Sequence, residues 1–490
     1  MKLPRRPTVD ELTSPVAVLG ASIGLYSLVF GVLTWQQQSR FATFGFDMGI
    51  FDQGIWLVSR FKEPFVTVRG LNYFGNHVNV ITVLFVPFYW LGAGPHFLYL
   101  IETLALAAGA IPIWLLARDR LANGWLALGL STAYLLNPSI QWINWWHFHP
   151  DALAVTPLLF AYWLGTKERW GWFTVAAVAA LLCKEDAALA LVGLGAVLAI
   201  RGHRKEGGIT AAVSVVWFTL CEKVIIPHAN GGLGAFYQDF YGDLGKSVFE
   251  IAWNAVRHPS RILRVMTNRE SQQYYKQLLG PFGYVPLAAP LVLLIALPHL
   301  TVNTISTFPN THNIRFQYSA LVTAALAIGA VEACAGLSTR VGFRRFLVGL
   351  VVASALASNV SSSPSPLSHN YRTGIWAAKG PRHAVADKAV HLVPGSAGVA
   401  ASYSLVPHLT HRVHIYEWPN PWIVGNWGIK GENPPDPKDV NYIVLDLTLN
   451  TEQRSLYDSL VGDGKEFKEV FHDQDYVVAK RVRKPDSSAG

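Results

Sequence analysis

Charged residues are scarce in this chain of 490 residues. Asp, Glu, Lys and Arg make up 15% of the sequence and hydrophobic residues 51%, whereas soluble domains average about 25% charged residues. This composition excludes an ordinary soluble domain and indicates an integral membrane protein. The net charge is +8. Because Lys and Arg gather at the ends of apolar runs and form no basic stripe, a nucleic-acid partner is not expected.

Cysteine and the common catalytic signatures are also rare or missing. The three cysteines, Cys183, Cys221 and Cys334, all lie in apolar segments. A disulfide framework in the hydrophilic C-terminal region is therefore excluded. The sequence has no phosphate-binding glycine loop, no HExxH motif, no zinc-spaced cysteine pair and no nucleophile elbow, so none of those chemistries is indicated.

The sequence is instead dominated by apolar runs. The first follows Lys2, Arg5 and Arg6, which by the positive-inside rule hold the N-terminus in the cytoplasm. It lacks a small-residue cleavage site and is expected to remain as an anchor. The basic loops between the runs are expected on the cytoplasmic side. This expectation predicts a multi-pass protein of the cell membrane with about nine crossings. The apolar runs lie at about 15–35, 78–92, 96–117, 122–138, 152–165, 171–200, 209–227, 280–306, 318–335 and 345–358.

Three of these runs are expected to be irregular. The run 78–92 is too short for a span of roughly 20 residues and is predicted to be reentrant or juxtamembrane. The run 171–200 is predicted to be two short helices that meet near Lys184, Glu185 and Asp186. Four prolines break 280–306, which predicts a hairpin or reentrant pair.

Acidic residues follow the first span directly. The segment 46–53 reads FDMGIFDQ and is expected on the outer face of the membrane. Carboxylates at a membrane interface are costly to desolvate unless a cation or a hydrogen-bond donor uses them. Asp47 and Asp52 are therefore candidates for chemistry. The alternative is an amphipathic surface helix whose acids face water.

Other polar residues are expected on the same face. The loop from Trp142 to Asp151 carries His149 and Asp151, which suit a general base or a divalent cation such as Mg or Mn. Asp151 can also be a helix N-cap. Lys184, with Glu185 and Asp186, is either a self-compensated ion pair or a phosphate site. His77 and Arg315 are candidate polar caps or, for Arg315, a phosphate partner.

The composition changes after 358. A transmembrane domain, 1–358, is followed by a Ser- and Pro-rich linker, 359–366, and by an external α/β domain, 367–490,. The expected strands are 398–402, 413–416, 442–447 and 476–480. Trp418, Trp422 and Trp427 can stack on sugar faces or anchor at lipid headgroups. Few contacts are expected to cross the linker.

These motifs resemble a known family. The segment 46–56, Asn76-His77, His149-Pro150-Asp151 and Lys184-Glu185-Asp186 are similar to the DUF2079 family of predicted membrane proteins. So are the later 394–416 stretch and Asp446. The family in turn resembles the GT-C superfamily of integral membrane glycosyltransferases, although the two acids of the first loop are separated by four residues where several GT-C families have an adjacent pair.

The resemblance implies a polytopic α-helical GT-C-like fold and an inverting glycosyltransferase. It would move a sugar from a polyprenyl-phosphate donor to a cell-envelope glycan, lipid or protein on the outer face. Asp47 is then the expected base, with Asp52 orienting the loop or holding metal, and Asp47 and Asp151 are the expected ligands of any divalent metal. Lys184 and Arg315, with His77, are expected to bind the donor phosphate. Two other classes stay open: a transporter or flippase of lipid-linked substrates, and a noncatalytic envelope-binding protein.

Overall fold

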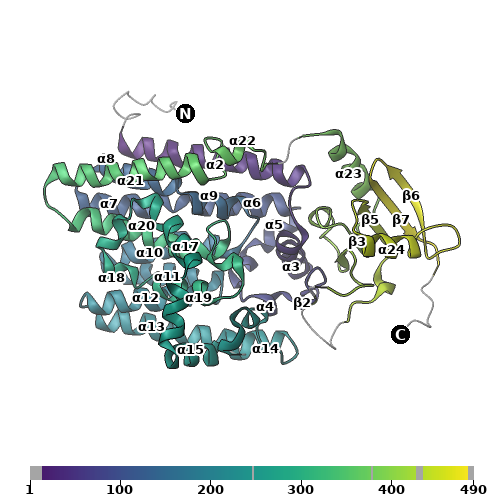
Figure 1. Cartoon of the computed structure of the whole chain (residues 1–490), viewed down its shortest axis with the longest axis horizontal. Helices are drawn as coiled ribbons and strands as arrows, with labels where there is room; N and C mark the ends of the chain where they lie inside the picture. The colour runs from purple at the N-terminus through teal and green to yellow at the C-terminus, as the bar shows by residue number, and fades with distance from the viewer. Residues whose placement is uncertain (1–13, 246–247, 377–378, 426, 428–433, 484–490) are drawn as a thin grey trace, which may run out of the picture.

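The computed structural model describes residues 14–245, 248–376, 379–425, 427 and 434–483. Within them a large helical body lies beside a smaller C-terminal domain built on a β-sheet (Figure 1). Lys2, Arg5 and Arg6, on which the expected orientation rests, lie outside the described residues. The segment that follows the first helix lies between the two parts (Figure 1).

Five helices in the described part of the chain are long and apolar enough to cross a membrane. They coincide with five of the predicted apolar runs, and the expected total of about nine crossings stays a prediction. These candidate spans are Pro15–Ser39, Pro95–Leu121, Arg204–Ala229, Gln317–Gly336 and Val341–Ser362.

The helices of the body begin and end where the sequence chemistry favours it. The first, α2 (Pro15–Ser39), starts with proline, and the Ser14 side chain accepts a hydrogen bond from the backbone N–H of Ala17 at 3.2 Å,. Further helices of the body are α6 (Pro95–Ala108), α7 (Ala110–Leu121), α8 (Gly124–Leu135), α9 (Pro138–Trp145), α10 (Pro150–Thr166), α11 (Trp170–Cys183), α12 (Ala187–Ile200), α13 (Arg204–Leu220), α14 (Ile226–Ala229), α15 (Val248–Arg257), α16 (Pro259–Met266), α17 (Arg269–Leu279), α20 (Ala320–Gly336) and α21 (Val341–Ser362).

The two predicted breaks are confirmed. Helices α11 and α12 flank Lys184, whose backbone is extended. The proline-rich run 280–306 forms only short helical pieces, including α18 (Pro290–Leu293) and α19 (Leu297–Ile305), because each proline removes a backbone donor. One prediction is wrong: residues 142–145 of the expected loop belong to the helix α9 (Pro138–Trp145), capped by Asn137, and the loop is only 146–149.

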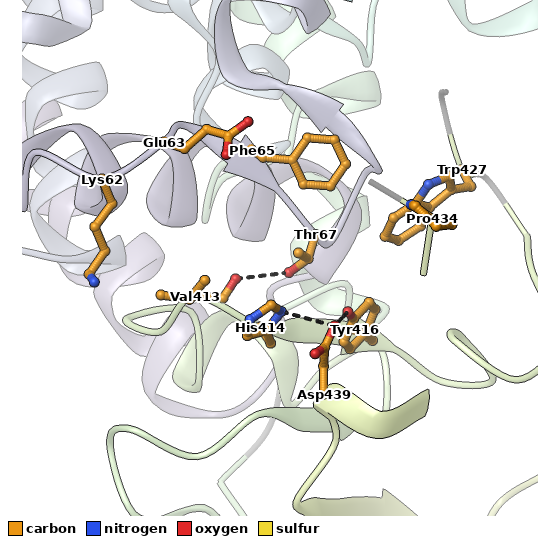
Figure 2. Close-up of a pocket in the computed structure, with 10 residues that line it drawn as sticks. All are labelled: Lys62, Glu63, Phe65, Thr67, Val413, His414, Tyr416, Trp427, Pro434 and Asp439. Atoms are coloured by element: carbon orange, nitrogen blue, oxygen red, sulfur yellow. Dashed lines mark hydrogen bonds and ion pairs between the residues drawn. The ribbon is translucent and has the colours of Figure 1, made fainter. Parts of the chain in front are cut away.

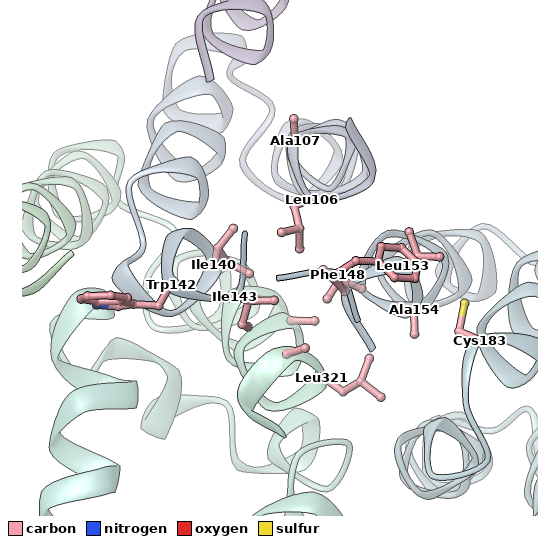
Figure 3. Close-up of a cluster of buried hydrophobic side chains, with 14 of the residues drawn as sticks. Leu106, Ala107, Ile140, Trp142, Ile143, Phe148, Leu153, Ala154, Cys183 and Leu321 are labelled. Atoms are coloured by element: carbon pink, nitrogen blue, oxygen red, sulfur yellow. The ribbon is translucent and has the colours of Figure 1, made fainter. Parts of the chain in front are cut away.

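The core of the body lies beneath that short loop (Figure 3). Phe148 is fully buried among side chains from several helices. Leu106 comes from α6, Leu153 from α10 and Leu321 from α20 (Figure 3). Burying a phenylalanine side chain contributes about 1.5–3 kcal/mol. Phe148 therefore anchors the loop between its two flanking histidines.

The segment after α2 folds into short elements. It begins with a π-helical turn, η1 (Gly45–Gly49), and continues through α3 (Ile50–Ser59). The small hairpin β1 (Phe65–Val66) and β2 (Leu71–Asn72) follows, then α4 (Tyr73–Asn76), η2 (Val80–Phe85) and α5 (Val86–Trp90). The last two lie within the run 78–92 and have 11 residues together, Val80–Trp90, too few to span a bilayer,.

The C-terminal domain holds a five-stranded mixed sheet in the order β4-β3-β5-β7-β6. Strands β3 (Val399–Ala401), β4 (Ile415–Glu417) and β5 (Tyr442–Asp446) are parallel. Strand β7 (Tyr476–Arg481) pairs antiparallel with β5, and β6 (Phe467–Asp473) pairs antiparallel with β7. The short helix α22 (His369–Arg372) precedes it, and α23 (Pro381–His391) and α24 (Thr451–Leu460) belong to it. Four strands were predicted. The sequence analysis missed β6 because its residues are mostly exposed and carry no apolar alternation.

The expected linker at 359–366 differs from its prediction. Helix α21 continues to Ser362, and Asn359, Ser363 and Ser365 are buried. The Asn359 amide donates to the Leu136 carbonyl at 2.9 Å and to Gln141 Oε1 at 2.8 Å. The serine and asparagine side chains of this segment thus form hydrogen bonds with one another and with neighbouring helices. They do not form a solvated spacer.

Many contacts cross from the first loop to the C-terminal domain, contrary to expectation. The Thr67 hydroxyl donates to the Ile415 carbonyl at 2.7 Å and accepts from the Ile415 N–H at 2.9 Å. The Gln53 amide donates to the Val413 carbonyl at 3.0 Å. Figure 2 shows the pocket beside this joint, where Thr67 faces Val413 and His414 faces Asp439. The sheet is therefore fixed to the first loop along strand β4.

Candidate functional site

One cavity of about 410 Å³ gathers most of the polar residues singled out in the sequence. It is lined by the first loop, the 146–151 loop, the α11–α12 junction, the 308–318 segment and the C-terminal domain. Aromatic side chains form much of its wall. The residues are Phe46, Asp47, Ile50, Phe51, Arg69, Asn76, His77, Trp146, His149, Asp151, Lys184, Phe236, Phe240, Phe308, Asn310, Phe316, Gln317, Tyr318, Tyr403 and Glu417.

Asp47 lies in the middle of the π-helical turn η1. Such turns are rare and occur frequently at functional sites. The glycines at its ends allow close packing: a Cβ at Gly45 would lie 2.8 Å from Val406 Cβ, and one at Gly49 would lie 3.1 Å from Val406 Cγ1. The C-terminal domain thus presses directly on the turn that carries Asp47.

His149 is the partner of Asp47. Its Nε2 lies 3.5 Å from Asp47 Oδ1. Burial disfavours the charged form of Asp47, but the hydrogen bond and charge of His149, with a smaller effect of His147, outweigh it and hold the pKa of Asp47 below its usual value,. Asp47 is therefore a carboxylate near neutral pH and accepts protons or hydrogen bonds.

Polar side chains beneath the cavity hold the 146–149 loop in place. The His149 backbone N–H donates to Glu102 Oε1 at 3.3 Å. The Tyr99 hydroxyl is 2.7 Å from His147 Nδ1, and burial lowers the pKa of His147 to about 4, so His147 is neutral. His149 points to Asp47, whereas His147 does not line the cavity.

Lys184 and Asp151 form a buried ion pair. Lys184 Nζ is 2.9 Å from Asp151 Oδ1 and 3.3 Å from Asp186 Oδ2, and the Lys184 side chain is 5% exposed. Asp151 lies in the first turn of α10 and does not cap it, because the N-cap position is His149. The ammonium group also lies 5.7 Å from the centre of the Tyr318 ring. Lys184 therefore presents a desolvated positive charge at the cavity.

His77 is held by Glu185. The His77 Nδ1 is 2.7 Å from Glu185 Oε1, and the Val78 N–H donates to Glu185 Oε2 at 2.9 Å. Glu185 and Asp186 do not line the cavity. They orient residues that do, His77 and Lys184.

Two of the predicted site residues lie elsewhere. Asp52 is fully buried at the joint between α3 and the C-terminal domain. It accepts hydrogen bonds from Tyr89 at 2.6 Å and from Thr410, and it lies 3.2 Å from His411 Nε2. Arg315 is exposed, and its guanidinium lies 4.7 Å from the centre of the Trp142 ring. Asp52 thus orients the first loop, and Arg315 does not enter the cavity.

Two charged residues of the cavity escaped the sequence analysis. Arg69 is 8% exposed, and its guanidinium lies 5.3 Å from the Phe46 ring and 4.7 Å from the Phe236 ring. Glu417 comes from β4, on the C-terminal domain. The only signal for Arg69 was a basic residue in an expected outer loop, where it has no topological role. Glu417 had no signal, because its position depends on how the sheet docks.

The predicted metal ligands, Asp47 and Asp151, both line the cavity and have different partners. Asp47 pairs with His149, and Asp151 pairs with Lys184. In the described part of the chain no group of three or more His, Cys, Asp or Glu side chains is placed to hold a metal ion.

Comparisons with known proteins concern the family and the fold of the chain. The sequence profile described as "Predicted membrane protein (DUF2079)" matches residues 38–475. No curated protein sequence matches the chain. The crystal structure of apo ArnT from Cupriavidus metallidurans has a TM-score of 0.57 at 14% identity, over 95% of this chain and 98% of that one. The same protein bound to undecaprenyl phosphate has a TM-score of 0.52 at 14% identity, over 97% and 99% of the two chains. ArnT is a GT-C family member. At this level of identity the likeness concerns the fold, and it confirms the GT-C-like architecture.

Proposed function

The chain belongs to the DUF2079 family of predicted membrane proteins, and from that premise and its cavity we propose that it is a GT-C type membrane glycosyltransferase. The proposed donor is a sugar linked to a polyprenyl phosphate. The proposed acceptor is a hydroxyl group of a cell-envelope glycan, lipid or protein. The observation that carries the proposal is a single cavity lined by a carboxylate, Asp47, and by two buried cationic side chains, Lys184 and Arg69.

This pairing suits transfer of a glycosyl group from phosphate. The acceptor hydroxyl attacks the anomeric carbon and gives its proton to Asp47, while the bond from that carbon to the phosphate oxygen breaks. The leaving phosphate keeps the electron pair and gains negative charge. Lys184 and Arg69 stabilise that charge where little water competes. Attack from the side opposite the phosphate inverts the anomeric carbon.

The remaining residues have supporting roles in this proposal. His149 keeps Asp47 ionised before the reaction. The aromatic wall, including Phe46, Phe236 and Phe308, suits the first isoprene units and the sugar faces,. The ArnT crystal structure with undecaprenyl phosphate supports a lipid of this class.

The test begins in cells. Deleting the gene is expected to remove one sugar from an envelope component and to raise the amount of one polyprenyl-phosphate sugar, both measured by mass spectrometry. The full-length protein in nanodiscs is then expected to bind undecaprenyl phosphate. An unchanged set of glycans and lipid-linked sugars, together with no lipid binding, contradicts the proposal. Lipid-linked sugar trapped on the cytoplasmic face, with no loss of transfer in vitro, identifies a flippase.

The proposed topology places the N-terminus in the cytoplasm and the cavity and C-terminal domain outside. Ser455 on α24 and Thr339 before α21 are both exposed, and the three native cysteines are buried. In intact cells a Ser455→Cys variant is expected to react with a membrane-impermeant thiol reagent, and a Thr339→Cys variant only after the membrane is broken. The reverse pattern contradicts the orientation and the outward-facing site with it.

A further inference from the structure

Strand β4 presents its two faces to two different cores. Side chains alternate along a strand, and Tyr416 packs within the C-terminal domain's own hydrophobic cluster, whereas Ile415 packs into the cluster shared with the helical body. Glu417, two residues after Ile415, lies on the same face. The register of the strand therefore directs the Glu417 carboxylate toward the helical body and its cavity.

A glycine allows the carboxylate to come close to the turn that carries Asp47. A Cβ at Gly45 would lie 3.2 Å from Glu417 Oε2. The Gly45 N–H donates to the Tyr403 carbonyl at 2.9 Å, which fixes the turn to the same domain. Asp47 and Glu417 thus reach one cavity from two parts of the chain that are 370 residues apart.

Glu417 has an unsatisfied oxygen. Its Oε2 is buried and has no hydrogen-bond partner among the described residues. Asp52, the other carboxylate at this boundary, is surrounded by Tyr89, Thr410 and His411. An unpaired buried carboxylate oxygen costs free energy. Because Glu417 lines the cavity, a ligand bound there can supply the missing hydrogen bond.

The charges around Glu417 define that ligand. Burial and the negative charge of Asp47 raise the pKa of Glu417 to about 7. Binding of a second anion beside Glu417, such as the donor phosphate, is disfavoured. In the proposed function the phosphate contacts Lys184 and Arg69 instead. A neutral hydroxyl group or a protonated amine is favoured instead.

We propose that Glu417 contacts the saccharide part of a substrate and binds one of its hydroxyl or amino groups beside Asp47. The inference rests on the proposed glycosyltransferase function and deepens it: the C-terminal domain supplies a substrate-binding residue. The group it binds belongs either to the sugar on the donor lipid or to the acceptor. Both sources have the same hydrogen-bonding chemistry, and they differ in which affinity depends on Glu417.

Binding to full-length protein in nanodiscs tests the proposal. The probes are undecaprenyl phosphate alone and undecaprenyl phosphate carrying a hexose or an aminohexose. Glu417→Gln is expected to bind bare undecaprenyl phosphate like the wild type. If Glu417 contacts the donor sugar, the variant loses about tenfold in affinity for the sugar-bearing lipid, as for a lost hydrogen bond to a charged group. If it contacts the acceptor, donor binding is unchanged and the KM for the acceptor rises by about tenfold.

The matched control is Glu452→Gln, an exposed glutamate on α24 of the same domain. It is expected to leave every value unchanged, and equal melting temperatures of the three proteins show that folding is intact. If Glu417→Gln and Glu417→Ala both keep wild-type affinity for the sugar-bearing lipid and the wild-type acceptor KM, the inference is wrong and the proposed function stands. If the wild type binds none of the lipids, the proposed function fails first.

Discussion

Replacing Asp47 with asparagine is expected to reduce glycosyl transfer by about a hundredfold or more. The substitution keeps the size of the side chain and its ability to hydrogen-bond to His149, but it removes the proton acceptor. General-base contributions of about 10²–10⁴ are typical. Donor binding should persist, because the phosphate partners Lys184 and Arg69 are untouched. The measurement is single-turnover transfer from a polyprenyl-phosphate sugar to a hydroxyl acceptor.

The matched control for this variant is Asp387→Asn. Asp387 lies on α23, and its side chain is 63% exposed, so turnover should not change. Near-normal turnover of Asp47→Asn would remove Asp47 as the base. The role would then pass to Asp151 or Glu417, which line the same cavity, and not to Asp52, which is sealed at the joint.

Replacing Lys184 with methionine is expected to have two separable effects. The first is a loss of stability of about 3–5 kcal/mol, because Asp151 is left as a buried charge without its partner. The second is a loss of affinity for undecaprenyl phosphate, since a phosphate partner acts in the ground state as well as in the transition state. Thermal unfolding and lipid binding measure the two effects independently.

The double variant Lys184→Met with Asp151→Leu separates the structural role from the functional one. Removing both partners of a buried ion pair is often nearly neutral for stability, so most of the lost stability should return. Lipid affinity should stay low if Lys184 contacts the phosphate. Recovery of lipid affinity together with stability would instead assign Lys184 a purely structural role.

The predicted site residues that the structure brings into one cavity share one property. Asp47, His149, Asp151 and Lys184 are polar residues in apolar surroundings, and the expected parity of the spans places them on one face. Their convergence on one cavity follows from the cost of leaving such groups unpaired at membrane depth. Several of the motifs that carried the DUF2079 and GT-C resemblance, those with Asp47, His77, His149 and Lys184, also line the cavity.

Asp52 shows the limit of that reasoning. In sequence it looks equivalent to Asp47. Asp47 lies in the π-helical turn and Asp52 in the α-helix that follows it, and the two carboxylates face different neighbours. Only the docked C-terminal domain, with Thr410 and His411, reveals what Asp52 binds.

Arg315 and Glu417 fail for a related reason. Arg315 has the right chemistry to bind phosphate, but its guanidinium lies over the ring of Trp142. Glu417 is the last residue of a short strand, β4, and its role depends on a sheet that packs against the first loop. Periodicity and span parity describe single elements. Neither can predict which side chains meet between the helical body and the C-terminal domain.

The hydroxyl of Thr67 has one more consequence. Strand β4 is at the end of the sheet, and the outward N–H and carbonyl of Ile415 are both bonded to that hydroxyl. Unprotected edge strands recruit further strands and promote aggregation. A fragment that begins after the last span would leave this edge bare, and it should pair with copies of itself in solution. The first loop therefore protects the sheet against self-association, a task that its sequence alone does not reveal.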